Sequence, residues 1–163
     1  MKVAVIGSGG REHSLCLALK KSSNVNEIFC IPGNAGTDNI AKNINLNLDD
    51  FEKIKDFFIS NEIALAIIGP EKPLVDGIVE YLENHNIKVF GPNKKASQLE
   101  GSKIFTKNLC KKYNIPTAKF GIFKNSKEAV NFLDGCEFPI VVKADGLASG
   151  KGVYICEDKN QSI

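Results

Sequence analysis

The chain has 163 residues and a formal charge of +2, from 21 Lys and Arg against 19 Asp and Glu. With 43% hydrophobic and 25% charged residues, its composition is that of a globular protein and excludes a disordered or fibrous chain. The charge is too low to favour nucleic acid as a partner, and no apolar run approaches the ~20 residues of a membrane span. Five cysteines without a CxxC pair favour reduced thiols in a cytoplasmic protein over disulfides or a metal site.

The first hundred residues alternate short apolar runs with segments of helical periodicity. Strands are predicted at the apolar runs, over residues 2–6, 27–31, 64–68 and 88–90. Helices are predicted over residues 12–21, from residue 51 onwards with Asp49 as a cap, and over residues 74–84. This alternation predicts an α/β domain over residues 1–100, with a Rossmann-like parallel sheet that is covered on both faces.

The pattern changes after Pro92, and a second domain is predicted over residues 101–163. Helices are predicted over residues 102–113 and 125–133, with an extended segment at 116–123 between them. A strand over residues 138–144, a glycine-rich loop over 145–152 and a short strand over 153–156 follow in close succession. Two strands joined by so short a loop predict a β-hairpin.

Four glycine-bearing loops follow the four predicted strands of the first domain, at residues 7–12, 32–37, 69–71 and 91–92. Ligands of open parallel sheets collect at the carboxyl ends of the strands. Glycines allow backbone N–H groups to approach an anion there, and the helix that follows adds its positive end. Any one of these loops could be an ordinary tight turn, but four at one edge predict a site for a phosphate-bearing ligand.

The first loop fits the dinucleotide-binding fingerprint G-x-G-x-x-G only in part, because Glu12 stands where the third glycine belongs. The second predicted strand ends in Ile31-Pro32-Gly33, without the acidic residue that holds the ribose hydroxyls of NAD. Both features argue against a Rossmann oxidoreductase. That class stays as an alternative, and tight binding of NAD(P)H would identify it.

Arg11 and Lys103 are each expected in the first turn of a helix, where a cation opposes the helix dipole at a cost of about 0.3–1 kcal/mol. A bound phosphate would turn this conflict into mutual support, whereas a solvated side chain that points away is the alternative. Arg11 is also the single arginine of the chain, which either reflects a need for its planar guanidinium or is chance. Glu12 and His13 beside it are candidates to bind a sugar hydroxyl.

Lys143 is expected inside the strand over residues 138–144, where a lysine is costly unless it has a partner. The glycine-rich loop begins two residues later, so the sequence predicts a cation beside a flexible cover for a polyphosphate. A plain surface hairpin is the alternative. The loop is not a Walker A motif, because the spacing from Gly146 to Gly150 is too short and a strand, not a helix, follows.

Several segments together resemble the phosphoribosylamine–glycine ligases (glycinamide ribonucleotide synthetases), a family of ATP-grasp enzymes. In chain order, the segments are GSGGREH, PGNAGT, IGPEKPLVDGI, FGPNKKASQLEGSKIFTKNLCKKYNIPTA and PIVVKADGLASGKGV. The resemblance runs from Met1 to about Tyr154. It implies a Rossmann-like N-terminal (pre-ATP-grasp) domain followed by the beginning of an ATP-grasp domain.

The resemblance also implies a reaction in de novo purine biosynthesis. ATP, glycine and 5-phosphoribosylamine would give glycinamide ribonucleotide, ADP and phosphate through a glycyl phosphate, with no side-chain nucleophile. ATP would act with Mg²⁺ or Mn²⁺, whose ligands are expected beyond residue 163, so the chain is interpreted as an N-terminal fragment that is inactive alone. A non-catalytic nucleotide- or phosphosugar-binding module, or another ATP-grasp ligase, is the alternative.

Two sets of binding residues are carried over from the resemblance. The ATP-binding set is Lys103, Lys143, Gly146, Ser149, Gly150, Lys151 and Gly152. The set on the phosphoribosylamine side is Gly9, Gly10, Arg11, Asn34, Gly36 and Glu71.

Overall fold

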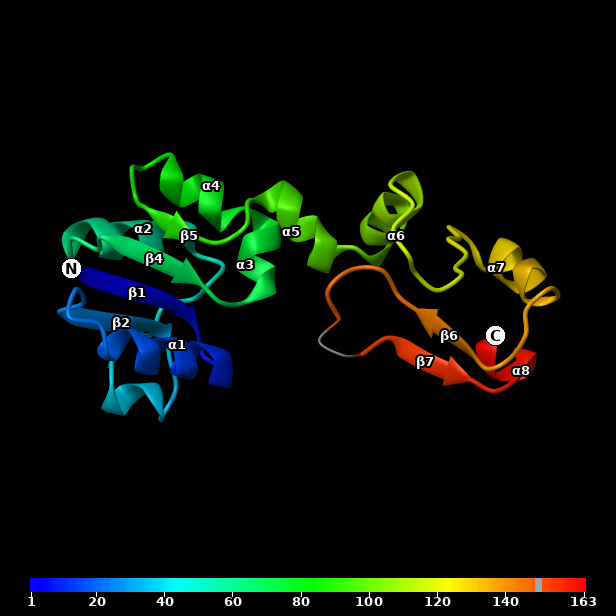
Figure 1. The fold of residues 1–163 in the computed structure, drawn as a ribbon, viewed down its shortest axis with the longest axis horizontal. Helices are drawn as coiled ribbons and strands as arrows, with labels where there is room; N and C mark the ends of the chain where they lie inside the picture. The colour runs from blue at the N-terminus through cyan, green and yellow to red at the C-terminus, as the bar shows by residue number, and fades with distance from the viewer. Residues whose placement is uncertain (149–150) are drawn as a thin grey trace. The chain divides into compact units, whose positions relative to one another are not determined.

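The computed structural model describes residues 1–148 and 151–163, and the chain divides into two compact units. Unit 1 runs from Met1 to Ser97 and unit 2 from Gln98 to Ile163 (Figure 1). Ser149 and Gly150, two residues of the expected ATP-binding set, lie outside the described residues.

Unit 1 contains a five-stranded parallel sheet with the strand order β3-β2-β1-β4-β5. The strands are β1 (Lys2–Gly7), β2 (Glu27–Pro32), β3 (Lys42–Asn43), β4 (Leu65–Ile68) and β5 (Val89–Phe90). The register places Val5 of the central strand opposite Cys30 on one side and Ile67 on the other. The predicted Rossmann-like parallel sheet is confirmed, and the structure adds β3, which was not expected from the sequence.

The helical elements of this part of the chain are α1 (Gly10–Lys20), the 3-10 helix η1 (Thr37–Asn39), α2 (Phe51–Ser60), α3 (Glu71–Asp76), α4 (Ile78–Glu83) and α5 (Lys94–Gly101). Two of them correct the sequence analysis. The cap of α2 is Asp50, which accepts the Lys53 N–H at 3.1 Å, and not Asp49. The single helix expected over residues 74–84 is two helices, because Gly77 between them adopts φ +101°, a conformation that favours glycine.

Successive side chains of β1 point to opposite faces of the sheet, and a core lies on each face. Ile6 packs in a cluster that includes Phe58 of α2 and Leu82 of α4, whereas Val5 packs in a second cluster with Cys16 of α1. All five side chains are at most 1% exposed. Burying a side chain of this size contributes about 1.5–3 kcal/mol, so two hydrophobic cores hold the strands of the sheet in place.

Unit 2 contains an antiparallel hairpin formed by β6 (Ile140–Lys143) and β7 (Val153–Cys156), in which Lys143 pairs with Val153. The predicted hairpin is therefore confirmed, although its first strand begins at Ile140 and not at residue 138. The helices are α6 (Lys103–Lys112), α7 (Ser126–Leu133) and α8 (Lys159–Ser162). No helix in the described part of the chain combines the length and the apolar character that crossing a membrane requires.

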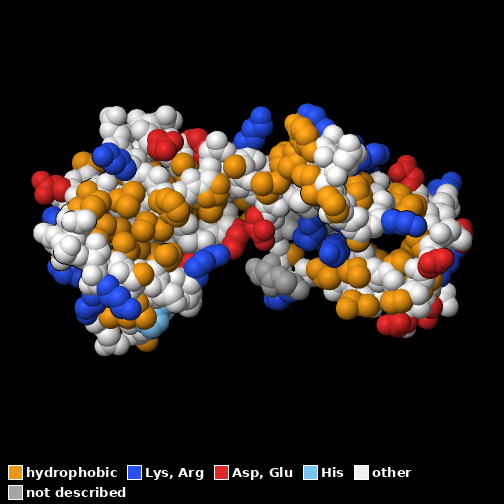
Figure 2. Space-filling view, viewed as in Figure 1, with side chains coloured by type: hydrophobic (Ala, Val, Ile, Leu, Met, Phe, Trp, Pro, Cys, Tyr) orange, Lys and Arg blue, Asp and Glu red, His pale blue; other side chains and the backbone are white. Residues whose placement is uncertain are grey.

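The hairpin of unit 2 is much more exposed than the sheet of unit 1. Val141 is 50% exposed, Tyr154 65% and Ile155 70%. Hydrophobic side chains are correspondingly visible on the surface around β6 and β7 (Figure 2). Most apolar residues of these two strands are therefore not buried within unit 2, although Cys156 at the end of β7 is 1% exposed.

Candidate functional site

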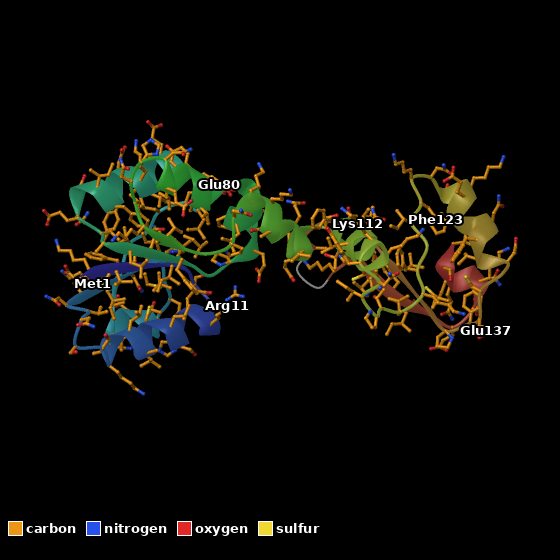
Figure 3. The ribbon with its side chains drawn as sticks, turned by 45° about the horizontal axis from the view of Figure 1, so that its top comes forward. Met1, Arg11, Glu80, Lys112, Phe123 and Glu137 are labelled. Atoms are coloured by element: carbon orange, nitrogen blue, oxygen red, sulfur yellow. The ribbon has the colours of Figure 1, made fainter. Side chains whose placement is uncertain are left out.

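The loops that follow β1, β2 and β4 meet at the carboxyl end of the parallel sheet. The Gly33 N–H donates to the Gly7 carbonyl at 3.1 Å, and the Gly69 N–H donates to the Ile6 carbonyl at 3.0 Å. In Figure 3, Arg11 lies at this end of the sheet and Met1 at the opposite end. We call the group formed by Gly9, Gly10, Arg11, Asn34, Gly36 and Glu71 the carboxyl rim.

A buried carboxylate, that of Glu12, occupies the centre of the carboxyl rim. The side chain is 4% exposed, and its Oε2 accepts the Gly9 N–H at 2.7 Å. A Cβ atom added at Gly69 would lie 2.1 Å from Glu12 Oε1, and one added at Gly7 would lie 2.6 Å from Glu12 Cγ. These two glycines therefore leave room for the Glu12 side chain. Glu12 stands at the position where the dinucleotide fingerprint has its third glycine.

The engagement of Glu12 corrects the sequence interpretation of this residue. A carboxylate that is buried and hydrogen-bonded to the chain itself is not placed to bind a sugar hydroxyl. The Gly9 N–H, which a phosphate at the start of α1 would use, already has an acceptor in Glu12. The loop is thus held together by its own anion, an arrangement that disfavours a dinucleotide pyrophosphate at this point.

Arg11 links the loop after β1 to the loop after β4. Its Nε–H donates to Glu12 Oε1 at 3.0 Å and its Nη1–H donates to Glu71 Oε1 at 3.1 Å. The hydrogen bonds to Glu12 and then to Glu71 raise the pKa of Arg11 above its ordinary value. The pKa of Glu71 is lowered by its own backbone N–H and then by the Arg11 guanidinium. Two carboxylates therefore offset the conflict between Arg11 and the dipole of α1.

Asn34 links the loop after β2 to the loop after β1. Its Nδ2–H donates to the Ser8 carbonyl at 2.8 Å, and its Oδ1 accepts the Gly36 N–H at 2.7 Å. A Cβ atom at Gly36 would lie 3.1 Å from Asn34 Oδ1 and 3.3 Å from His13 Cε1, so this glycine is closely packed. Asn34 therefore connects two loops of the carboxyl rim, and His13 lies beside Gly36.

Some residues of the carboxyl rim face solvent, and others are engaged within the protein. Arg11 is 56% exposed and Glu71 is 44% exposed at their side chains. A Cβ atom at Gly10 would meet no atom within 4 Å. The open position at Gly10 is therefore adjacent to the exposed Arg11, which pairs with Glu71. Glu12 and Asn34 form hydrogen bonds to the backbone of the loops. The role of Glu12 in holding the loops together could not be found from the sequence, because it depends on the packing of α1 against Gly69 in the loop after β4.

In unit 2, the glycine-rich loop is attached to the start of α6. The Lys103 Nζ donates to the Gly146 carbonyl at 2.8 Å, and the Asp145 carboxylate accepts the Ser102 hydroxyl at 3.1 Å and the Ile104 N–H at 3.2 Å. Burial raises the pKa of Asp145. The N–H groups of Ile104 and Gly146 and the Ser102 hydroxyl outweigh that effect and hold this pKa below its ordinary value.

The other described residues of the expected ATP-binding set lie along the hairpin. Lys143 is exposed at the last position of β6, which corrects the expectation of an interior strand position. The loop closes through the Ala144 N–H, which donates to the Gly152 carbonyl at 2.9 Å. Gly152 itself adopts φ +68°, and Lys151 is exposed. Both lysines thus stand where a ligand over the hairpin could reach them.

The described residues do not form a metal site. Among residues 1–148 and 151–163, no three His, Cys, Asp or Glu side chains are grouped so that they could hold a metal ion.

A shallow hollow in unit 1 lies away from the carboxyl rim. It has a volume of about 340 Å³ and is lined by Asn26, Glu27, Ile28, Asp38, Asn39, Ile40, Ala41 and Lys42. Glu27 begins β2, so the hollow is at the opposite end of that strand from the rim. None of the expected site residues lines it.

Comparison with known protein families assigns both parts of the sequence. Residues 1–100 match the N domain of phosphoribosylglycinamide synthetase, and residues 101–163 match the ATP-grasp (A) domain of the same family. The chain belongs to the phosphoribosylglycinamide synthetase family. The family resemblance inferred from the sequence motifs is thereby confirmed, as is a Rossmann-like domain followed by the beginning of an ATP-grasp domain.

Individual relatives support the assignment of the chain to the phosphoribosylglycinamide synthetase family. The phosphoribosylamine–glycine ligase of Clostridium acetobutylicum is 50% identical over 158 residues, which are 97% of this chain and 38% of the relative. The crystal structure of phosphoribosylamine–glycine ligase from Thermotoga maritima has a TM-score of 0.78 and 33% identity, covering 99% of this chain and 37% of that one. The chain therefore spans well under half the length of these relatives, which are named as ligases.

Enzymes with other names share this fold. N5-carboxyaminoimidazole ribonucleotide synthetase from Thermotoga maritima has a TM-score of 0.73 at 22% identity, over 99% of this chain and 43% of that one. At this identity the likeness concerns the fold alone.

Proposed function

We propose that this chain is the part of an ATP-dependent ligase that holds phosphoribosylamine and the phosphates of ATP. The enzyme would join glycine to 5-phosphoribosylamine and form glycinamide ribonucleotide, ADP and phosphate in de novo purine biosynthesis. The observation that carries the proposal is the match of both halves of the chain to consecutive domains of one family, with a 50% identical relative named phosphoribosylamine–glycine ligase. A cytoplasmic location is part of the same proposal.

The carboxyl rim of unit 1 is proposed as the phosphoribosylamine side. Arg11 and Glu71 are the groups that a ligand would contact, because their side chains are 56% and 44% exposed beside the open position at Gly10. Asn34 and Gly36 would contribute through the shape of the two loops, since Asn34 bonds to the Ser8 carbonyl and to the Gly36 N–H.

The glycine-rich loop of unit 2 is proposed as the ATP-phosphate side. Lys103 and Lys143 would spread negative charge over the transferring phosphate, with residues 146–152 as the cover. The terminal phosphoryl group would pass to the glycine carboxylate, and the amine of phosphoribosylamine would then attack the acyl carbon and release phosphate. Neither step needs a nucleophile from the protein.

A binding measurement tests the role of the carboxyl rim. Ribose 5-phosphate, a stable probe for the phosphoribosyl group, should bind the chain in calorimetry, and Arg11→Ala should weaken that binding about tenfold because a charge-assisted contact is lost. Lys20→Ala, at the other end of α1, is the matched control and should bind as the unaltered chain does. Equal binding by the Arg11 and Lys20 variants would remove the rim from the proposal.

A turnover measurement tests the reaction and the competing interpretation as a binding module. A longer polypeptide that contains this chain should release ADP only when glycine, phosphoribosylamine and MgATP are all present. The 163-residue chain alone should release none under the same conditions. Binding of ribose 5-phosphate without turnover in the longer polypeptide would favour a non-catalytic module.

A further inference from the structure

The start of helix α6 is held by a carboxylate from a distant part of the chain. The Ile104 N–H in the first turn donates to Asp145 Oδ1 at 3.2 Å, and the Ser102 hydroxyl contacts both Asp145 oxygens at 3.1 and 3.2 Å. The Ser102 oxygen also caps the helix locally by accepting the Phe105 N–H at 3.1 Å. An anion is thus present at a helix start, where the dipole favours it.

A second contact joins the same two segments. The Lys103 Nζ donates to the carbonyl oxygen of Gly146, the residue after Asp145, at 2.8 Å. Gly146 adopts φ +90°, a conformation that favours glycine, although a Cβ atom there would meet no atom within 4 Å. Two adjacent residues of the loop therefore hold three adjacent residues at the start of the helix.

None of these contacts pairs the Lys103 ammonium with an anion. Lys103 donates to a neutral carbonyl, and in the described part of the chain it forms no ion pair within 4 Å with Asp145. Asp145 is bound instead by the helix N–H groups and the Ser102 hydroxyl. The carboxylate offsets the unfavourable position of a lysine in the first helical turn, while the ammonium keeps its capacity to bind a phosphate.

We propose that Asp145 is a positioning residue: it locks the start of the glycine-rich loop onto α6 and so fixes where the Lys103 ammonium stands. This inference rests on the proposed role of Lys103 at the phosphates of ATP. Lysine has a flexible four-carbon stem, so a fixed ammonium requires the loop carbonyl to be in a fixed place. Asp145 supplies that fixed place, while the Ser102 oxygen caps the helix through the Phe105 N–H.

The proposal is tested with the 163-residue chain and three variants. Asp145→Asn removes the charge and one acceptor oxygen. Ser102→Ala removes one donor to the carboxylate together with the cap on the Phe105 N–H, and it leaves the charge of Asp145. Asp134→Asn is the matched control in unit 2, because Asp134 is an exposed carboxylate whose ion pair among residues 1–148 and 151–163 is with Lys159 on the surface. MgATP and adenosine are the two probes, with affinity measured by calorimetry.

We expect Asp145→Asn to weaken the binding of MgATP about tenfold and to leave that of adenosine unchanged, because the loss concerns the phosphate-binding lysine. Ser102→Ala should weaken MgATP binding about threefold, and Asp134→Asn should not change it. The rate at which an amine-specific reagent labels Lys103, followed by mass spectrometry of its peptide, should rise in the same order. A variant that only loosened the fold would lower both affinities together.

The outcomes separate this inference from the function on which it rests. If the unaltered chain does not bind MgATP, the proposed ATP-phosphate site fails, and the role of Asp145 fails with it. If the unaltered chain binds MgATP and Asp145→Asn binds it equally well, the site stands and Asp145 has no positioning role. Loss of adenosine binding alongside that of MgATP also overturns the inference. Should Asp145→Asn fail to fold, Asp145→Glu, which keeps the charge and displaces the carboxylate, is measured with the same two probes, and MgATP binding equal to that of the unaltered chain overturns the inference.

Discussion

The carboxyl rim of unit 1 and the glycine-rich loop of unit 2 are both rich in glycine, yet they are built in different ways. At the rim, the Glu12 carboxylate is buried, and the glycines at positions 7 and 69 make room for it. At the loop, Asp145 and Lys103 attach an exposed hairpin to one helix start. Glycine thus leaves room for a packed side chain at the rim, whereas in the loop it permits backbone conformations with positive φ.

The largest difference should be seen in amide hydrogen exchange. The amides of β1 and β2, which border two buried cores, should exchange about 1000-fold more slowly than those of β6 and β7, which corresponds to about 4 kcal/mol in the free energy of opening. Exchange measured by NMR on the whole chain gives both values in one sample. Equal protection of the two sheets would abolish the contrast.

A second prediction concerns the packing of glycine against Glu12. Gly69→Ala would place a Cβ atom 2.1 Å from Glu12 Oε1 and displace a buried, hydrogen-bonded carboxylate. The free energy of unfolding of unit 1 should fall by about 2–3 kcal/mol in urea titration. Gly10→Ala, where nothing lies within 4 Å, is the control and should cause no loss. Similar losses in both variants would contradict the tight packing at Gly69.

A third prediction concerns the charge of Glu12. Glu12→Gln keeps the shape but leaves one acceptor oxygen for two donors, the Gly9 N–H and the Arg11 Nε–H. We expect the free energy of unfolding to fall by about 1–2 kcal/mol. Glu62→Gln serves as the comparison, because that carboxylate is 85% exposed and meets Lys2 at 3.7 Å, and it should cost about 0.5 kcal/mol or less. A larger loss from the Glu62 variant would be the opposite of this expectation.

The smallest effect should come from the exposed link between Arg11 and Glu71. Because the pKa of Glu71 is lowered in the folded chain, its contribution to stability is complete above the ordinary glutamate value of ~4.3 and is lost as the pH falls through the folded value. Screening by solvent limits the change to about 0.5 kcal/mol. Unfolding curves between pH 3 and 6 should show this component in the unaltered chain and not in Glu71→Gln. An unchanged pH dependence in the variant would mean that other carboxylates produce it.

The sequence was sufficient to predict the elements that bury continuous apolar runs. β1, β2 and β4 are such runs, and the hairpin was marked by two short strands around a glycine loop. β3 could not be found, because Lys42–Asn43 is a two-residue polar strand at the sheet edge that carries no hydrophobic signal. Lys143 was assigned an interior strand position because its neighbours are apolar, but burial depends on what packs against a strand, and β6 is exposed within unit 2.

The candidate site was predictable in its location and not in its internal chemistry. Parallel strands bring their following loops to one edge, so the proximity of Arg11 and Glu71 followed from the predicted sheet. That Glu12 fills the space between Gly7 and Gly69 could not be inferred, since it depends on how the side chain from α1 packs against the end of β1 and the loop after β4. Likewise, a helix start that looks ready for a phosphate can already be satisfied by a carboxylate such as Asp145.

The open space beside Gly10 offers a practical opportunity. A side chain grafted there would project from the first residue of α1 without disturbing any neighbour within 4 Å. Gly10→Cys coupled to an environment-sensitive fluorophore would place a dye next to the exposed arginine, and its emission would report whether a sugar phosphate binds there and how fast.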